Sequence, residues 1–372
     1  TLMLVCFTSF AKDIEGPYTS LHKSAGLPLH SLLNINDVAH WIDGDALSAH
    51  NPNTGGNGVY FPRLTYGAGI IYTDGLLWGG FVNDGSTPSL RVGGTAYTTG
   101  MMGGAILSPG VAENPDAEDV RIFRIRRDFN KADLTQDAAE LEEIALQDVT
   151  DAELAALREQ YKKDWLEWPA DKGAPFYDAD GDGEYNPVIN DDGSPKLAPT
   201  GDEEYDPEIH ADEPGYAGAD QVIWFVCNDL NSGRMFNLYG SPPMGMEMQV
   251  TFWGYKRTDA LGYAVFKKYK LIYKGTAETP ANATIDSMFV AQFADPDLGE
   301  YSDDFVGCDT TKSISFCYNS SAIDASFRVF DLAPPASGYD FLQGPLVPGV
   351  AGEDRNKNGV DDAEDSGIFD GK

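Results

Sequence analysis

The sequence predicts a mainly β protein with one or more antiparallel β-sandwich domains, an inserted α-helical hairpin and calcium-binding loops. Three observations support this prediction. Short apolar runs separated by Gly, Asp and Pro recur along much of the chain. One segment without Gly or Pro has helical periodicity, and two loops place acidic or amide side chains at alternate positions before a glycine. The 372 residues, 42% of them hydrophobic, are enough to form well-buried cores.

The N-terminal half begins with an apolar segment and continues with strand-like runs. Residues 1–11, "TLMLVCFTSFA", resemble the end of a secretory signal, and they equally fit an ordered strand, either internal or donated to a neighbouring subunit. Residues 12–130 are predicted to form a β-rich domain. Within it, the "TDG" of residues 73–75 lies between two apolar runs, which predicts a tight hairpin turn.

A helical insertion is predicted over residues 131–170. Thr150 followed by Glu153 is the signature of a capping box, in which each residue satisfies an exposed backbone N–H at the start of a helix. Apolar residues then recur at helical spacing and form one stripe, which is typical of a packing face. This stripe consists of Leu154, Leu157, Tyr161 and Trp165.

The strongest strand pattern lies in residues 220–340, which are predicted to form an antiparallel β-sandwich. It starts with the buried run "DQVIWFVCNDL" and continues with two long strands around the turn "RTDALG". On the second of these strands, alternation predicts one apolar face and one face carrying the lysines. The apolar face consists of Tyr263, Val265, Tyr269, Leu271 and Tyr273.

The acidic segment 171–219 contains a loop that matches much of a calcium-binding pattern. Calcium takes six to eight oxygen ligands, and a loop surrounds it with side chains at positions 1, 3 and 5, a glycine at 6 and a carbonyl at 7. Position 12, which normally supplies a carboxylate, is Ile189, so the missing ligand is expected from Asp191, Asp192 or the patch of Glu203, Glu204 and Asp206. The metal candidates of this loop are Asp178, Asp180, Asp182, Glu184, Asn186 and Asp191.

A second loop of this kind lies in residues 341–372, which are predicted to be an acidic linker. It fills all the ligand positions of the pattern, including position 12. Both loops resemble, locally, the calcium loops of dockerin and thrombospondin type 3 modules, and Ca²⁺ is the expected ion. The metal candidates of the second loop are Asp354, Asn356, Asn358, Val360, Asp362 and Asp365.

The charge of the protein limits its binding partners, and its few cysteines limit its disulfides. The net charge of −33 repels phosphate backbones and anionic headgroups, which argues against nucleic acid and membrane surfaces as partners. No stretch after the N-terminal run approaches the length of a transmembrane helix, so no transmembrane anchor is expected. Cys308 and Cys317 bracket "DTTKSISF" and are either a disulfide across a strand pair or two free thiols.

The sequence contains no recognisable catalytic constellation. Its five histidines form no zinc-binding helix motif, and there is no nucleophile elbow or phosphate loop. The sequence has so many acidic residues that it does not exclude a pair of catalytic carboxylates of the glycosidase type. Whether the protein is an enzyme is therefore undecided, and the pattern favours a protein that is not one.

Several strings resemble a group of large secreted proteins of unknown activity from Bacteroidota-like bacteria. They include "VRIFRIRRDF", "ADQVIWFVCNDL", "DWLEWPADKGAPFYDADGDGEYNP", "YGSPPMGMEMQVTFWGYKRTDALGYAVFKKYKLIYKG" and "GYDFLQGP". The resemblance covers roughly residues 35–345. It implies an N-terminal signal, secretion by the type IX system to the medium or the cell surface, and a longer parent chain with fibronectin-like modules. It implies no activity and no catalytic residues.

Together these observations predict an extracellular, calcium-stabilised structural or adhesive surface protein that assembles into a filament or layer. Its expected partners are copies of itself, other cell-surface proteins or glycans. The alternative is a secreted carbohydrate-active enzyme or a carbohydrate-binding module.

Overall fold

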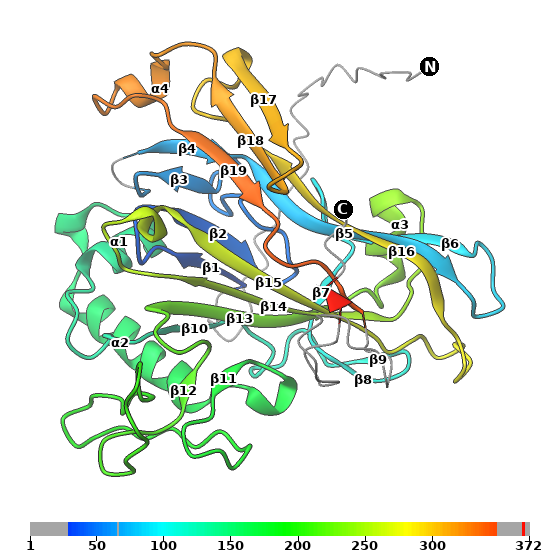
Figure 1. Ribbon diagram of the computed structural model, residues 1–372, viewed down its shortest axis with the longest axis horizontal. Helices are drawn as coiled ribbons and strands as arrows, with labels where there is room; N and C mark the ends of the chain where they lie inside the picture. Colours follow the sequence, from blue (N-terminus) through cyan, green and yellow to red (C-terminus); the bar gives the residue numbers. More distant parts are fainter. Residues whose placement is uncertain (1–28, 65–66, 348–366, 369–372) are drawn as a thin grey trace.

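The computed structural model describes residues 29–64, 67–347 and 367–368 (Figure 1). Within these ranges the protein is mainly β, with 35% strand and 16% helix arranged in several antiparallel sheets. The predicted fold class is confirmed at this level. Residues 1–11 and the second calcium loop, residues 354–365, lie outside the described residues.

A central sheet organises the molecule. Its strand order is β10-β13-β14-β15, and the short β7 also pairs with β13. The strands are β7 (Met102–Gly103), β10 (Phe123–Arg126), β13 (Gln221–Asn228), β14 (Met246–Gly254) and β15 (Val265–Tyr273). All eight residues of β13 are buried, as are all four of the shorter β10.

Alternate residues of β13 enter two different cores, because successive side chains of a strand point to opposite faces. The odd-numbered residues from Ile223 to Cys227 belong to the first core. The even-numbered residues from Val222 to Val226 belong to the second core. Both faces of the central sheet are therefore covered, each by a different part of the chain.

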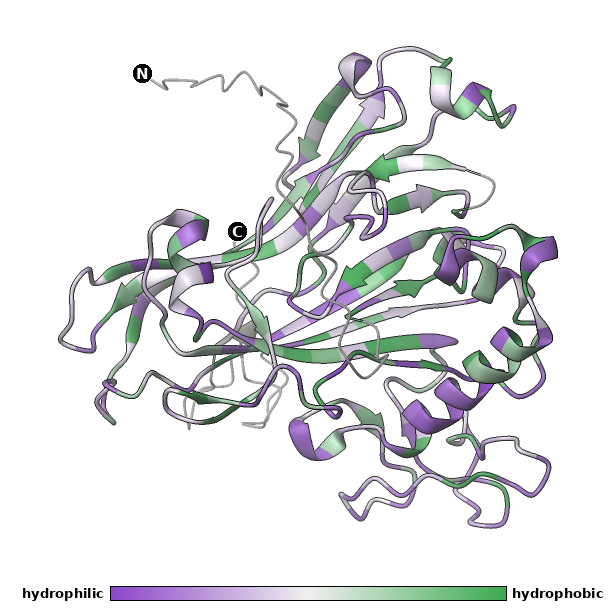
Figure 2. Cartoon of the chain, turned by 180° about the vertical axis from the view of Figure 1, so that it is seen from behind, coloured by the Kyte–Doolittle hydropathy of each residue, from purple (hydrophilic) through white to green (hydrophobic). Residues whose placement is uncertain are grey.

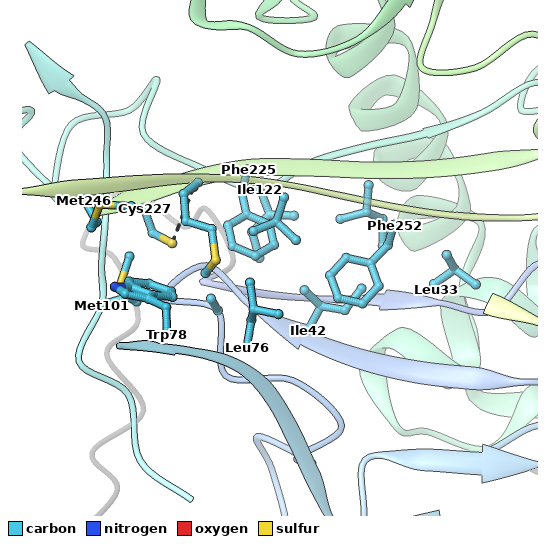
Figure 3. Packing of buried hydrophobic residues seen from close by; sticks show 14 of the residues in the cluster. Leu33, Ile42, Leu76, Trp78, Met101, Ile122, Phe225, Cys227, Met246 and Phe252 are labelled. Carbon is cyan, nitrogen blue, oxygen red and sulfur yellow. Dashed lines mark hydrogen bonds between the residues drawn. The ribbon is translucent and has the colours of Figure 1, made fainter. Parts of the chain in front are cut away.

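The first core lies between the central sheet and the strands β1, β2 and β5. Figure 3 shows Phe225 and Phe252 of the central sheet facing Ile42 and Leu76 across this core. The outer strands belong to two further sheets, with the orders β1-β2-β3-β4 and β16-β5-β6. Their bounds are β1 (His30–Leu33), β2 (Ala39–Asp43), β3 (Val59–Phe61), β4 (Ala68–Ile71), β5 (Thr73–Val82), β6 (Leu90–Gly94) and β16 (Ile285–Asp295).

The prediction of a hairpin turn at residues 73–75 is wrong. These residues start the long strand β5, where Thr73 pairs with Asp295 and Asp74 pairs with Ala294. The polar Asp74 is tolerated in the strand because its side chain finds buried partners rather than solvent.

Strands that are distant in sequence share sheets. The strand β10, from the predicted domain 12–130, pairs with β13 from the predicted sandwich 220–340, and β5 pairs with β16 in the same way. The remaining strands form a sheet of order β17-β18-β19 and three short pairs. Their bounds are β8 (Ile106–Ser108), β9 (Val111–Ala112), β11 (Phe176–Tyr177), β12 (Glu213–Pro214), β17 (Asp304–Asp309), β18 (Ile314–Asn319), β19 (Ala336–Asp340), β20 (Leu346–Val347) and β21 (Gly367–Ile368).

Cys308 and Cys317 are free thiols and not a disulfide. They lie on the neighbouring strands β17 and β18, as expected, but the register places Cys308 opposite Ser315 and Cys317 opposite Val306. Cysteines displaced by two residues across a strand pair are about 7–8 Å apart, beyond the usual span of a disulfide.

The predicted arrangement of lysines on β15 is wrong at one position. Lys268 and Lys270 are exposed, as expected for the outer face. Lys267 instead lies two residues before Tyr269 on the inward face, and it is largely enclosed. A strand period of two dictates this placement, and the charge of Lys267 requires a partner inside the protein.

Two helices form in the predicted insertion, and the longer of them covers the second core. They are α1 (Thr135–Glu142) and α2 (Asp151–Leu166), and the capping box of Thr150 and Glu153 is present at the start of α2. The predicted stripe is confirmed, since Tyr161 and Trp165 are buried in the second core and Leu154 and Leu157 pack against it. The other helices are α3 (Ser232–Tyr239), α4 (Ala325–Arg328) and the 3-10 turns Leu146–Asp148, Ala170–Lys172, Ala260–Tyr263 and Tyr301–Asp303.

A buried polar network attaches this helical pair to the sheets. The Arg124 guanidinium donates to Asp137 at 2.5 Å and to the side-chain oxygen of Asn34 at 2.9 Å. The Tyr161 hydroxyl donates to the other oxygen of Asp137 at 2.6 Å. Although burial acts against its charge, the neighbouring Arg124 holds the pKa of Asp137 below its usual range. None of the helices that the structure describes is long and apolar enough to cross a membrane.

Substitution in the capping box tests how much the N-terminal cap of α2 contributes to the stability of the protein. We expect Thr150→Ala to lower the free energy of unfolding by about 1 kcal/mol, because Thr150 is exposed and its hydroxyl accepts from the Glu153 backbone N–H. Denaturant unfolding measures this change. Thr150→Ser keeps the hydroxyl and should stay close to the wild type, and equal losses in both variants would contradict the capping role.

Candidate metal centre

The first acidic loop begins directly after β11 and turns on two glycines. Gly181 and Gly183 have φ values of +76° and +82°, a left-handed conformation that other residues rarely adopt. The Asp178 carboxylate closes this turn, since it accepts from the backbone N–H of Gly181 at 2.7 Å and of Gly183 at 2.9 Å. The sequence correctly placed a glycine at the sharp turn after Asp182.

The next acidic residues of the loop organise its own backbone. Asp180 accepts from the N–H of Asp182 at 3.2 Å, and Asp182 accepts from the N–H of Glu184 at 2.7 Å. The second oxygen of Asp182 accepts from the side-chain amide of Asn186 at 3.1 Å. These bonds hold the loop in a curved conformation with Asp178 and Asp180 on one side.

Asp212, which was not among the residues predicted from the sequence, lies beside Asp178 and Asp180. The short strands β11 and β12 pair in antiparallel register, with Tyr177 opposite Glu213. Asp178 follows the first strand and Asp212 precedes the second, so the pairing brings the two carboxylates together across a separation of 34 positions in the chain. Asp212 is almost fully buried, and it accepts from the N–H of Ala179 at 2.8 Å and of Asn186 at 2.9 Å.

The three carboxylates of Asp178, Asp180 and Asp212 form a carboxylate trio. In the part of the chain that the structure describes, they are the only group of three or more acidic, histidine or cysteine side chains with ligand atoms all within 4.8 Å of one another. Partial loss of water around Asp180 and the neighbouring negative charges, chiefly those of Asp182 and Asp212, raise the pKa of its carboxyl. The trio therefore concentrates negative charge that favours a cation.

The chemistry of the trio fits a hard metal ion. It offers only carboxylate oxygens, the donors that Ca²⁺, Mg²⁺ and Mn²⁺ prefer, and neither the thiolates nor the imidazoles typical of a zinc site. Each carboxylate oxygen that accepts one backbone N–H keeps a second lone pair. Asp178 and Asp212 are thus held in place by the backbone while still able to coordinate.

The other residues proposed for the missing ligand lie elsewhere. Ile189, at position 12, packs against the second core, so the chain after Asn186 turns inward and Asp191 does not join the trio. Asp192 accepts from the backbone N–H of Ser194 within its own turn. Glu203 and Asp206 likewise accept from backbone groups beside them, at Thr200 and Glu208. The only sequence signal for Asp212 is that it directly precedes a short buried strand.

Few apolar contacts hold this loop on the rest of the protein. Figure 2 shows mostly hydrophilic colouring in the segment beyond α2, in contrast to the central sheet. The main anchor is Tyr185, whose hydroxyl donates to the backbone oxygen of Trp165 at 2.6 Å and whose ring contacts Phe176. Beneath the loop, the buried Glu213 pairs with Arg127 at 2.6 Å. Because so few apolar contacts attach the loop, repulsion among the carboxylates of the trio weakens its attachment to the rest of the protein.

A second acidic cluster lies after β16, with Asp297 at its centre. Burial, followed by the negative charges of Asp295, Asp304 and Glu300, raises the pKa of Asp297 to about 7. Asp304 accepts from the backbone N–H of Leu298 at 2.8 Å, which keeps its own charge close to Asp297. Unlike the trio, this cluster does not bring three ligand atoms within metal-binding distance of one another.

The fold and the trio thus define a mainly β protein with a surface-loop site of carboxylate donors. No protein-family model, curated protein or solved structure matches the chain.

The raised pKa of Asp297 predicts a pH effect on stability. Since the unfolded state ionises near 3.8 and the folded state near 7, folding is favoured when Asp297 is protonated, and stability falls as the pH rises from 3.8 through 7. Asp297→Asn should therefore stabilise the protein at pH 8, by about 1 kcal/mol once solvent screening of this half-buried group is allowed for. Thermal melts at pH 5 to 8 measure the effect.

A matched variant separates this effect from a general loss of negative charge. Asp340→Asn removes one charge from an exposed position on β19. It should change the melting temperature less than Asp297→Asn at pH 8. Equal stabilisation by both variants, or no loss of the pH dependence in Asp297→Asn, would contradict the account of this cluster.

Proposed function

We propose that the protein is an extracellular, calcium-stabilised structural or adhesive surface protein. The observation that carries this proposal is the carboxylate trio, in which Asp212 joins the two loop residues Asp178 and Asp180. Extracellular residence is supported by the resemblance of the sequence to secreted proteins. Calcium at millimolar concentration is available outside cells, where loose sites bind it with dissociation constants of about 10⁻⁴–10⁻³ M.

Calcium is the proposed ion because of the loop around the trio. A curved loop with further oxygen-bearing side chains beside the trio suits the six to eight ligands and flexible geometry of Ca²⁺. Asp182, Glu184 and Asn186 lie next to the trio, and Asn186 also bonds to Asp212 through its backbone N–H. Magnesium requires a tighter octahedron and retains its waters, so it should substitute poorly.

The role proposed for the ion is stability. Without a cation, three negative charges share one small region, and one of them, Asp212, is buried. A bound ion removes this repulsion and fixes a segment that has few apolar anchors. Binding to the folded state alone adds about 2.7 kcal/mol when free calcium is 100 times the dissociation constant. The proposal extends to the second loop, with Asp354, Asp362 and Asp365 as ligands.

We propose that the β17-β18-β19 sheet mediates self-assembly. The β17-β18-β19 sheet exposes several large apolar side chains, among them Phe305, Val306 and Tyr318. Within the described residues β17 pairs only with β18, so its other edge can pair with a strand of another copy. We also propose that the layers enclosing the first core form a β-sandwich, since both contribute side chains to it.

Calcium removal tests the role of the trio. Thermal melts in EGTA should show a lower melting temperature than melts in millimolar calcium, and magnesium should restore little of the difference. Asp178→Ala should reduce the calcium-dependent rise, because it removes one member of the trio. The control is Asp191→Asn, an exposed residue of the same segment outside the trio, which should respond as the wild type does. Identical melts with and without calcium would contradict the proposal.

The edge of β17 tests self-assembly. Val306 is 77% exposed, and Val306→Lys places a charge on this edge, which should lower the oligomer size measured by light scattering. The control, Val329→Lys, changes a residue of similar exposure outside the sheet and should leave the oligomer size unchanged. A wild-type protein that stays monomeric at all concentrations would argue against self-assembly.

A glycan screen separates the structural proposal from a carbohydrate-active enzyme. The purified protein is incubated with a panel of polysaccharides and its products are analysed. The structural proposal predicts no turnover. Turnover that is lost on a single Asp→Asn or Glu→Gln change would overturn it.

A further inference from the structure

A second site lies inside the protein, where side chains from several strands surround Asp74. Its carboxylate is fully buried on β5 and receives the Lys267 ammonium from β15 and the Ser48 hydroxyl from the loop after β2. The Tyr339 hydroxyl, from β19, donates to the same carboxylate at 2.5 Å. His40, on β2, places Nε2 4.0 Å from it. Four separate segments thus converge on one carboxylate of β5.

Aromatic rings and buried residues enclose most of this cluster. The Lys267 nitrogen lies 5.1 Å from the centre of the Phe252 ring and 5.5 Å from that of Tyr339. His40 is 2% exposed, and its Nε2 makes no hydrogen bond. In such an environment the separated charges of an ion pair are costly, and a neutral amine beside a neutral carboxyl becomes competitive.

Burial opposes the charges of the Lys267–Asp74 pair and makes proton transfer within it less costly. Burial lowers the pKa of the Lys267 amine and lowers that of His40 to about 3, so the imidazole is neutral. Burial acts to raise the pKa of Asp74, although the nearby ammonium brings it below its ordinary value. Transfer of one proton from Lys267 to Asp74 converts the ion pair into an amine and a carboxylic acid without a change in total charge.

We propose that Lys267 and Asp74 form an intramolecular amide bond that crosslinks β15 to β5. The Lys267 nitrogen attacks Cγ of the protonated Asp74 carboxyl, and a C–N bond forms. One C–O bond then breaks, and that oxygen leaves as water with the carboxyl proton and one proton of the amine. The reaction requires no oxidant, metal or cofactor.

The neighbours of the pair have roles in this step. Tyr339 and Ser48 donate hydrogen bonds to the carboxyl oxygens and stabilise the negative charge that develops there in the transition state. The amine proton passes directly to the departing oxygen, because Lys267 Nζ already donates to Oδ2 of Asp74. The neutral His40 beside the pair adds no competing positive charge. The water leaves through a cavity of about 220 Å³ that is lined in part by Tyr339, Ser337 and Cys317.

The bond would join two strands that are 193 positions apart in the chain. It would link the central sheet to the β16-β5-β6 sheet across the first core. Such a link suits a protein exposed to force or protease outside the cell. It is independent of calcium and of the proposed function, because it forms from residues of the chain alone.

Mass spectrometry of the denatured full chain tests the proposal. The wild type should be lighter than its sequence mass by one water molecule, and Lys267→Met and Asp74→Ala should show no such deficit. Lys270→Met, which changes an exposed lysine of the same strand, should keep it. A tryptic digest should contain a branched peptide joining the segments around residues 74 and 267, without cleavage after Lys267.

Two results would overturn the proposal. One is a wild-type protein of full sequence mass with normal cleavage after Lys267. The other is a water deficit that persists in Lys267→Met, which would place the modification elsewhere. The wild-type digest is decisive even if a variant fails to fold. Tyr339→Phe should leave a fraction of the chains unlinked, because it removes one hydrogen bond that stabilises the transition state.

Discussion

The structure depends on the burial of both faces of β13. A strand with apolar side chains on both faces needs a layer on each side, and the chain supplies these layers from different places. On one side, β1, β2 and β5 enclose the first core. On the other side, α2 and the acidic segment cover the second core with Trp165 and the partly buried Tyr185. An otherwise hydrophilic segment is therefore required to lie against an apolar surface.

Placing this acidic segment against the second core brings the negative charges of the carboxylate trio close together. The acidic segment has few apolar residues with which to hold its position, and the pairing of β11 with β12 forces Asp178 and Asp212 together. Backbone N–H groups compensate part of the negative charge, and a cation can compensate the rest. Beside the first core, the buried charge of Asp74 is compensated by the Lys267 ammonium and by hydroxyl donors rather than by backbone N–H groups.

Features that depend on neighbouring residues in the chain could be predicted from the sequence. The strand-rich class, the capping box at Thr150 and the apolar stripe ending at Trp165 each follow from a local period or motif, and the structure contains them. Features that depend on distant pairing could not. Asp212 joins the trio only because β12 pairs with β11. The inward position of Lys267 follows from the strand period, but its partner Asp74 lies 193 positions away in the chain. The same holds for the residues 73–75, whose turn-like composition is overridden by pairing with β16.

We propose that a cation bound by the trio holds the first acidic loop in place. Hydrogen–deuterium exchange of the peptide covering residues 178–186 tests it locally, apart from any effect of the second loop. We expect slower exchange in calcium than in EGTA for the wild type, and no calcium effect in Asp212→Asn. Equal exchange in both conditions for the wild type, or full protection by calcium in Asp212→Asn, would contradict it.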